Sequence, residues 1–293
     1  MSRPLSSMTD SPIDATPSSL PEKKSPDNHP YVQRGPSDSR SPCPALNTLA
    51  NHGYIKHSGQ DIGFIELVKA LHHVYNLTWS LCIFLAAVGL YISGSFTFTT
   101  RPKDPSQSDT ILNRLRPIVP MPRWRIDLAS LSIRGPGKIA HDASFVHPNY
   151  VESHAPNQGL LAKLLSYTTS CSSGRCRCGL SLFDMARYHQ QRESELSQPL
   201  GDFQRKVALG ECGLAWAVMR KRCATMDRQG SGDSANSERD DLVPHHIIQG
   251  WLGGEQLPDD WWCDGGSRPV HSIGLFEAKK RAGDVAKIIE NKS

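Results

Sequence analysis

The sequence lacks the features that define several large classes of protein. Its 293 residues carry a formal net charge of only +4 and contain no long basic run, so the charge pattern does not predict nucleic-acid binding. No repeat with a period of about 20–50 residues is present. The apolar content of 38% argues against both a fully disordered chain and a protein with several membrane spans. A chain of this length can bury a substantial core.

The amino-terminal segment also lacks an export signal, because no apolar run follows a basic start. Of the first 42 residues, 18 are Pro or Ser. Such a composition buries too little apolar surface to offset the entropy lost on ordering. We therefore expect residues 1–27 to form a disordered Pro/Ser-rich tail, and the protein to be intracellular.

The eight cysteines are expected to be free thiols, because disulfides belong mainly to exported proteins. Cys82, Cys212 and Cys223 lie in apolar, helical surroundings and are typical of buried small hydrophobes. The cluster at 171–178 does not have the spacing of a standard zinc site. We expect a loop of surface thiols there, with metal binding as the less favoured alternative.

Apolar periodicity predicts a mainly α fold, with no strand-rich region to compete. We expect residues 94–125 to be loop-rich, because they contain five prolines, and residues 126–133 to form a short helix or strand. The helices are expected at 44–53, 61–76, 77–93, 181–196, 201–223, the first part of 243–262, and 276–293.

The segment 77–93 is 17 residues long and has no charge. A membrane-spanning helix needs about 20 apolar residues, with about 17 at the lower limit. The segment also contains Thr78, Ser80 and Gly89. We favour a buried core helix over a membrane span.

Cys43 lies between two prolines, immediately before a predicted helix. Proline fixes the backbone on both sides, so Cys43 is expected at the N-cap, where the unpaired N–H groups of the first turn point toward its sulfur. That environment lowers the pKa of a thiol and stabilises the thiolate, which is the metal-binding form. The alternative is an ordinary loop cysteine.

Glu211 interrupts an apolar stripe on the predicted helix 201–223. The stripe consists of Phe203, Val207, Glu211, Leu214 and Val218. A buried carboxylate has a raised pKa and suits proton transfer near neutral pH. The alternatives are a glutamate at the edge of the stripe, or one paired with Arg187 or a neighbouring base.

His141 and Asp142 form a third candidate pair, because an aspartate beside a histidine can orient the imidazole or share its proton. Most such dipeptides are surface turns, so the pair alone is weak evidence. The histidine pairs at 72–73 and 245–246 are expected to be structural, because adjacent residues on a helix do not face one site.

These motifs resemble those of the fungal heme-thiolate peroxidases, the family of chloroperoxidases and unspecific peroxygenases. The family's Pro-Cys-Pro motif is present as Pro42-Cys43-Pro44 and is followed by LNTLANHGY at 46–54. Its second motif, Glu-His-Asp or Glu-Gly-Asp followed by Ala-Ser, is present as AHDAS at 140–144. Further similar segments lie at 180–197, 208–218 and 253–262, so the resemblance extends over about residues 29–275.

The resemblance implies a single helical domain of chloroperoxidase type at 28–275, built around one heme b, with a helical extension at 276–293. It implies a peroxidase or peroxygenase that uses hydrogen peroxide to oxidise a small organic substrate, in a tailoring step of fungal secondary metabolism. Cys43 would be the axial thiolate ligand of the heme iron. Glu211 would move a proton between the peroxide oxygens, and His141 and Asp142 would orient Glu211.

One departure from the family pattern is Ala140, which replaces a glutamate that helps to hold a divalent cation beside a heme propionate. The remaining ligands would be the His141 carbonyl and the Ser144 hydroxyl, so we expect a weak or absent Mg²⁺/Mn²⁺ site. The lost glutamate leaves open a peroxide-independent heme enzyme, such as an isomerase or dehydratase. The run 77–93 leaves open a membrane-anchored, non-catalytic heme binder. No feature predicts an oligomeric state.

Overall fold

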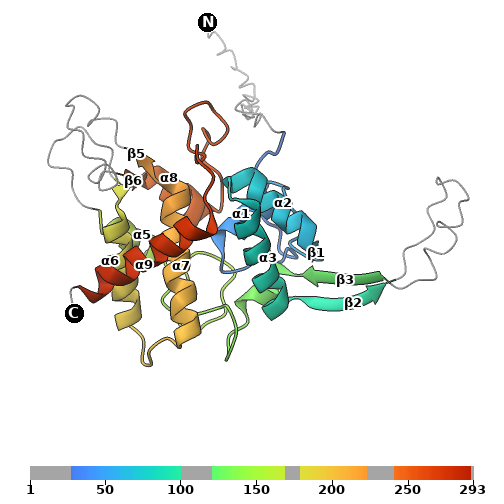
Figure 1. Cartoon of the computed structure of the whole chain (residues 1–293), viewed down its shortest axis with the longest axis horizontal. Helices are drawn as coiled ribbons and strands as arrows, with labels where there is room; N and C mark the ends of the chain where they lie inside the picture. The colour runs from blue at the N-terminus through green and yellow to red at the C-terminus, as the bar shows by residue number, and fades with distance from the viewer. Residues whose placement is uncertain (1–27, 100–120, 169–178, 223–240, 292–293) are drawn as a thin grey trace, which may run out of the picture.

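The structure is a computed structural model, and it describes residues 28–99, 121–168, 179–222 and 241–291. The predicted tail at 1–27, the cysteine cluster at 171–178 and Cys223 lie outside the described residues. In the described part, helices form the body of the molecule (Figure 1). The mainly α prediction is therefore confirmed.

Ten helical segments and six short strands make up the described elements. The helical segments are α1 (Pro44–Asn51), α2 (Phe64–Tyr75), α3 (Trp79–Ser93), the 3-10 helix η1 (Leu128–Ser132), α5 (Gln158–Leu165), α6 (Leu182–Ser194), α7 (Asp202–Met219), α8 (His245–Ile248), the π-helix η3 (Gln249–Gly253) and α9 (Leu275–Glu290). The strands are β1 (Ile62–Gly63), β2 (Ser95–Thr99), β3 (Met121–Ile126), β4 (Gly179–Leu180), β5 (Lys221–Arg222) and β6 (Asp241–Pro244). They pair antiparallel in two small sheets, in the orders β1-β3-β2 and β4-β6-β5.

The prediction of loop at 94–125 is wrong at both ends, where β2 and β3 pair from Ser95↔Arg125 to Thr99↔Met121. The reason is the alternation of Phe and Thr in β2, which suits a strand. Residues 126–133 divide between the end of β3 and η1. Helix α5 was not predicted, and it begins where the Asn157 side chain accepts a hydrogen bond from the Leu160 N–H.

Helix α3 confirms the predicted helix at 77–93 but not its burial. One side packs into the core through Leu81, Cys82, Ala86 and Leu90. The other side is exposed, and Tyr91 retains 81% of its accessible surface. Within the described ranges, no helix is long and apolar enough to cross a membrane.

Helix α7 carries Glu211, and its position is fixed by close packing against α9. An added Cβ at Gly213 would lie 2.8 Å from the backbone of Arg281, so only glycine permits this approach. The Trp216 ring on α7 also packs against the guanidinium groups of Arg220, at 4.7 Å, and Arg281, at 5.2 Å. Figure 1 shows α9 lying across α6 and α7. The predicted C-terminal helix is therefore part of the same helical body.

Candidate active site

Cys43 occupies the N-cap of α1 in an extended conformation, with Pro44 at the first helical position. This placement confirms the prediction from the two flanking prolines. Cys43 is half-buried, and its sulfur makes no capping hydrogen bond, although the nearby backbone N–H groups of Leu46 and Ala45 act to lower the pKa of the thiol. The prediction that this environment lowers the pKa is wrong, because burial and the nearby Glu211 carboxylate raise the pKa of the Cys43 thiol to about 12 against the effect of those N–H groups. A cation bound at the sulfur would supply the opposite charge that a thiolate needs here.

The chain leading into Cys43 is held by the buried Asn47 of α1. The Asn47 side-chain oxygen accepts the Ser41 N–H at 2.9 Å, and its amide donates to the Ser41 carbonyl at 2.7 Å and to Glu255 Oε1 at 2.6 Å. Glu255 is also buried, and burial raises the pKa of its carboxyl. The hydrogen bonds at both ends of this amide fix the direction of the Cys43 side chain. Sequence analysis missed Asn47 and Glu255, because a single polar residue in a short helix or in an irregular segment gives no signal of its burial.

Arg40 anchors the same segment one helical turn further along α1, at Asn51. Its guanidinium is fully buried and donates to Asn51 Oδ1, at 2.8 and 3.1 Å, and to the carbonyl oxygens of Ser39 and His57. A buried charge is tolerated only when its donors are satisfied. These contacts hold the strand-like segment before Cys43 against α1.

Glu211 pairs with His141, whose Nε2 lies 3.2 Å from Glu211 Oε2. The Glu211 side chain is 54% exposed, which fits the alternative of a glutamate at the edge of the stripe and not that of a buried carboxylate. Phe203, in the same stripe, is also partly exposed. Helical phase predicts which residues share a face, but not what covers that face. Arg187 lies over the Phe183 ring. The partner of Glu211 is therefore the neighbouring base His141 and not Arg187.

The hydrogen bonds of His141 indicate where its protons lie. Nδ1 is 2.6 Å from the carbonyl oxygen of Asp142, and a carbonyl only accepts, so Nδ1 carries a hydrogen. A proton is then shared between Nε2 and the Glu211 carboxylate. Burial alone would lower the pKa of His141, but the charge and hydrogen bond of Glu211 and the bond to the Asp142 carbonyl outweigh it, so the pKa is raised. The raised pKa favours the imidazolium form of His141 beside the Glu211 carboxylate.

The Asp142 carboxylate points away from this pair. It accepts hydrogen bonds from Arg134 Nη1 at 2.5 Å and from the Tyr150 N–H at 2.6 Å. The expectation that Asp142 orients Glu211 directly is therefore wrong, since the structure places only His141 against it. Asp142 acts on the pair through its backbone carbonyl, and its side chain organises the loop.

Helix α6 holds this loop in an unfavourable backbone conformation. Ala143 has φ +62°, a left-handed geometry that costs energy for a residue with a Cβ. Its N–H donates to Asn149 Oδ1 at 2.9 Å, and its carbonyl lies 3.2 Å from Nδ1 of His189. Arg192 donates to the Ser144 carbonyl at 3.1 Å and to Asn149 at 2.9 Å. The predicted capping box of Ser181 and Asp184 starts this helix.

The candidate cation position offers few oxygen ligands. Ala140 contributes no side-chain donor, and its carbonyl accepts from Gln204 Nε2 at 3.2 Å. The Ser144 carbonyl is taken by Arg192. In the described ranges, no group of three or more His, Cys, Asp or Glu side chains could hold a metal ion. A weak or absent divalent-cation site at His141 and Ser144 stays a prediction.

His147 is a further titratable group at the site that sequence analysis missed. It is buried, with Nδ1 3.1 Å from Ser153 Oγ and with Nε2 lacking a hydrogen-bond partner in the described structure. Burial lowers the pKa of His147 to about 4, while the charge of Glu211 acts in the opposite direction. Glu211 thus acts electrostatically on Cys43, His141 and His147. Packing brings these residues together from α1, the 134–151 loop and α7.

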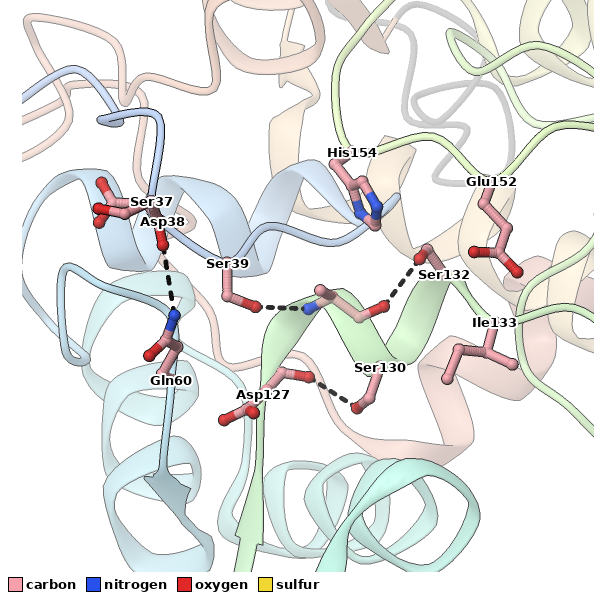
Figure 2. Close-up of a pocket in the computed structure, with 11 residues that line it drawn as sticks. Ser37, Asp38, Ser39, Gln60, Asp127, Ser130, Ser132, Ile133, Glu152 and His154 are labelled. Carbon is pink, nitrogen blue, oxygen red and sulfur yellow. Dashed lines mark hydrogen bonds between the residues drawn. The ribbon is translucent and has the colours of Figure 1, made fainter.

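A separate polar pocket of about 500 Å³ lies beside η1. Two of its serine hydroxyls make hydrogen bonds that are drawn in Figure 2. Ser39 Oγ accepts the Ala129 N–H and so joins the segment before Cys43 to η1, whereas Ser132 Oγ donates to the Ala129 carbonyl within η1. Asp38 is engaged by Arg40 and His57. None of the predicted site residues lines this pocket. We therefore assign its side chains a structural role, in holding the segment before Cys43, and not a catalytic one.

Comparison with known proteins indicates the family of this chain. The family model described as "Peroxidase, family 2" matches residues 29–264. Similar curated proteins include a chloroperoxidase of Leptoxyphium fumago, 61% identical over 46 residues (15% of this chain, 12% of that protein), and an aromatic peroxidase of Fusarium equiseti, 35% identical over 101 residues (32% and 22%). An aromatic peroxygenase of Cyclocybe aegerita is 24% identical over 188 residues (62% and 47%). The chain thus matches less than half the length of each of these relatives. Because the family model covers most of its length, the chain belongs to peroxidase family 2, the chloroperoxidase family.

Proposed function

We propose that this chain is a heme-thiolate peroxidase or peroxygenase that uses hydrogen peroxide to oxidise a small organic substrate. The observation that carries the proposal is the pairing of an acid–base couple, Glu211 and His141, with a cysteine at a helix N-terminus. A dothistromin biosynthesis peroxidase of Dothistroma septosporum, 34% identical over 67 residues (23% of this chain, 16% of that protein), supports a tailoring step in fungal secondary metabolism.

The residues fit one heme b per chain. Cys43 would hold its iron through the sulfur, because the sulfur lies at a helix N-terminus and needs a cationic partner to ionise. The partly exposed apolar side chains of α7, such as Phe203 and Leu214, suit contact with a flat apolar ring. When bound, a thiolate-ligated heme supplies the chemistry that cleaves the O–O bond of a peroxide.

Glu211 would carry the proton in this cleavage. Its Oε atoms take a proton from one oxygen of hydrogen peroxide and return it to the other, which leaves as water. An exposed carboxylate is suited to the first step, because it can accept a proton and can be reached by peroxide. The same group, once protonated, acts as the acid for the second step.

His141 would be a positioning residue for Glu211. Its Nδ1 is fixed by the Asp142 carbonyl, so Nε2 is directed at Glu211 Oε2. An imidazolium at that place pairs with the carboxylate and limits its rotamers. The loop around Ala143, which is held by hydrogen bonds such as that from the Ala143 N–H to Asn149, keeps the His141 imidazole in this orientation.

The test is turnover of a phenolic probe by the heme-loaded full-length chain, with and without hydrogen peroxide. We expect oxidation that requires peroxide and is lost on substitution of Glu211 by Gln. Conversion of a substrate without peroxide would favour the isomerase or dehydratase alternative. Heme uptake with neither activity would favour a non-catalytic heme binder.

A further inference from the structure

Glu255 is a buried carboxyl that takes no part in the proton transfer proposed for Glu211. It lies two residues after the end of η3, and only 5% of its surface is accessible. Its backbone has φ +51°, a left-handed geometry that is unfavourable for a residue with a Cβ. Such conformations persist only where the surrounding structure holds them, and they are concentrated at functional sites. The burial and the backbone geometry together point to a role for this side chain beyond packing.

Two asparagines of α1 hold Glu255 against that helix. Asn51 Nδ2 donates to the Glu255 carbonyl at 3.2 Å, and Asn47 Nδ2 donates to Glu255 Oε1 at 2.6 Å. The turn that follows is held in the same way, because the Leu257 N–H donates to His52 Nε2 at 3.1 Å. These bonds join segments about 200 residues apart in the sequence, since Asn47 and Glu255 are separated by 208 positions. The carboxyl of Glu255 is therefore directed at the first turn of α1.

A directed chain of hydrogen bonds leads from the Cys43 backbone to Glu255. The Cys43 N–H donates to Ser41 Oγ at 3.2 Å. Ser41 Oγ lies 3.1 Å from Asn47 Oδ1 and 3.3 Å from the Cys43 carbonyl. That carbonyl already accepts the Asn47 N–H, so we assign the hydroxyl hydrogen to the nearer amide oxygen. Asn47 Nδ2 then donates to Glu255 Oε1. Every donor points toward Glu255, and bonds aligned in this way strengthen one another.

We propose that Glu255 is a positioning residue for Cys43. It acts through the side chains of Asn47 and Ser41, which are both fully buried, so water does not readily replace a lost partner. The prolines at 42 and 44 have no N–H, and the Cys43 N–H is the only backbone donor of the segment 42–44. Holding this one donor therefore holds the backbone that carries the sulfur. The inference rests on the proposed function, because a fixed sulfur matters here as the group that holds iron.

The test compares two variants of the full-length, heme-loaded chain. Glu255→Leu keeps the bulk of the side chain and removes the acceptor, whereas Glu255→Gln keeps an acceptor oxygen. The first reading is hydrogen–deuterium exchange of the Cys43 amide by mass spectrometry, and the second is the fraction of heme with a red-shifted Soret band when reduced under carbon monoxide. We expect Glu255→Leu to speed exchange by about tenfold, as the loss of one buried hydrogen bond would, and to lower that fraction. Glu255→Gln should restore both readings.

A second variant, Ser41→Ala, removes the middle of the chain and leaves Glu255 in place. It should speed exchange as much as Glu255→Leu does, and the two together should add little, because they break the same chain. Asp184→Leu is the matched control, since it removes a buried carboxyl that bonds to Ser181 at the start of α6, and it should leave the exchange of Cys43 unchanged. Circular dichroism and heme uptake check that each variant is folded.

Three results would contradict these expectations in different ways. Wild-type exchange and a wild-type band in Glu255→Leu would overturn the proposal. Equal losses in Glu255→Leu and Glu255→Gln would assign the effect to charge and would also overturn the hydrogen-bond chain. A wild-type chain without the red-shifted band would refute the proposed function instead, and the exchange of Cys43, which can be read without heme, would still decide the role of Glu255.

Discussion

Substitution of Glu211 by glutamine separates proton transfer from every other role of this residue. The amide is isosteric with the carboxylate and can still hydrogen-bond to His141 Nε2, now as a donor to a neutral imidazole. It cannot accept a proton from peroxide. His141 would also lose the charge that raises its pKa, so burial should then return that pKa toward or below its ordinary value.

The expected loss of rate follows from the usual contribution of general acid–base catalysis to such reactions. Removing a positioned general acid–base group typically slows the step by about 10²–10⁴-fold. This corresponds to about 3–5 kcal/mol of activation free energy, since about 1.4 kcal/mol is a factor of ten. Heme uptake should not change, because Glu211 is not proposed as a ligand. The assay is stopped-flow absorbance of the heme-loaded protein mixed with peroxide, read as the second-order rate constant.

Glu277→Gln is the matched control, because Glu277 is a carboxylate on α9 that pairs with Arg220 rather than with the site. It should react with peroxide at the wild-type rate. A Glu211→Gln variant that also reacts at the wild-type rate would refute the assignment. The proton would then have to move through another group, and His141 and His147 would be the first to substitute.

Two further predictions concern stability. Gly213→Ala should lower the free energy of unfolding in urea by about 1–3 kcal/mol, because its Cβ would meet the Arg281 backbone at 2.8 Å. Gly283→Ala, in open space on α9, should instead raise it by about 0.5–1 kcal/mol, and equal effects would contradict the packing argument. His147 has a folded-state pKa of about 4, so the unfolded chain binds the extra proton below about pH 6.5. Unfolding free energy should therefore fall by about 2–4 kcal/mol as pH drops from about 6.5 to 4. His147→Gln should flatten this slope, and an unchanged slope would show that other groups cause it.

The local parts of the site could be predicted from sequence because they depend on neighbouring residues. Two prolines around Cys43 predict an N-cap position, and the spacing of Ser181 and Asp184 predicts a capping box. Both are present. Helical phase also predicts that Glu211 shares a face with apolar residues.

The parts that depend on tertiary packing could not be predicted in the same way. Phase does not say what lies above a face, so it left a buried and an edge position open for Glu211 and missed the exposure of half of α3. Glu255 and His147 are polar residues in irregular segments, and only the packed structure shows that they are buried. In the 94–125 segment the prolines predicted a loop, although the alternation of Phe and Thr is typical of the strand that forms there, β2.

The central claim is that Cys43 binds the heme iron as a thiolate. The most direct measurement is the absorption spectrum of the heme-loaded chain, reduced under carbon monoxide. The wild-type chain should give the strongly red-shifted Soret band of a thiolate-ligated heme, and Cys43→Ala should lose it. Cys263→Ala, which removes an exposed free thiol, should retain it. A histidine-type band in the wild-type chain, or a red-shifted band that survives Cys43→Ala, would contradict the assignment.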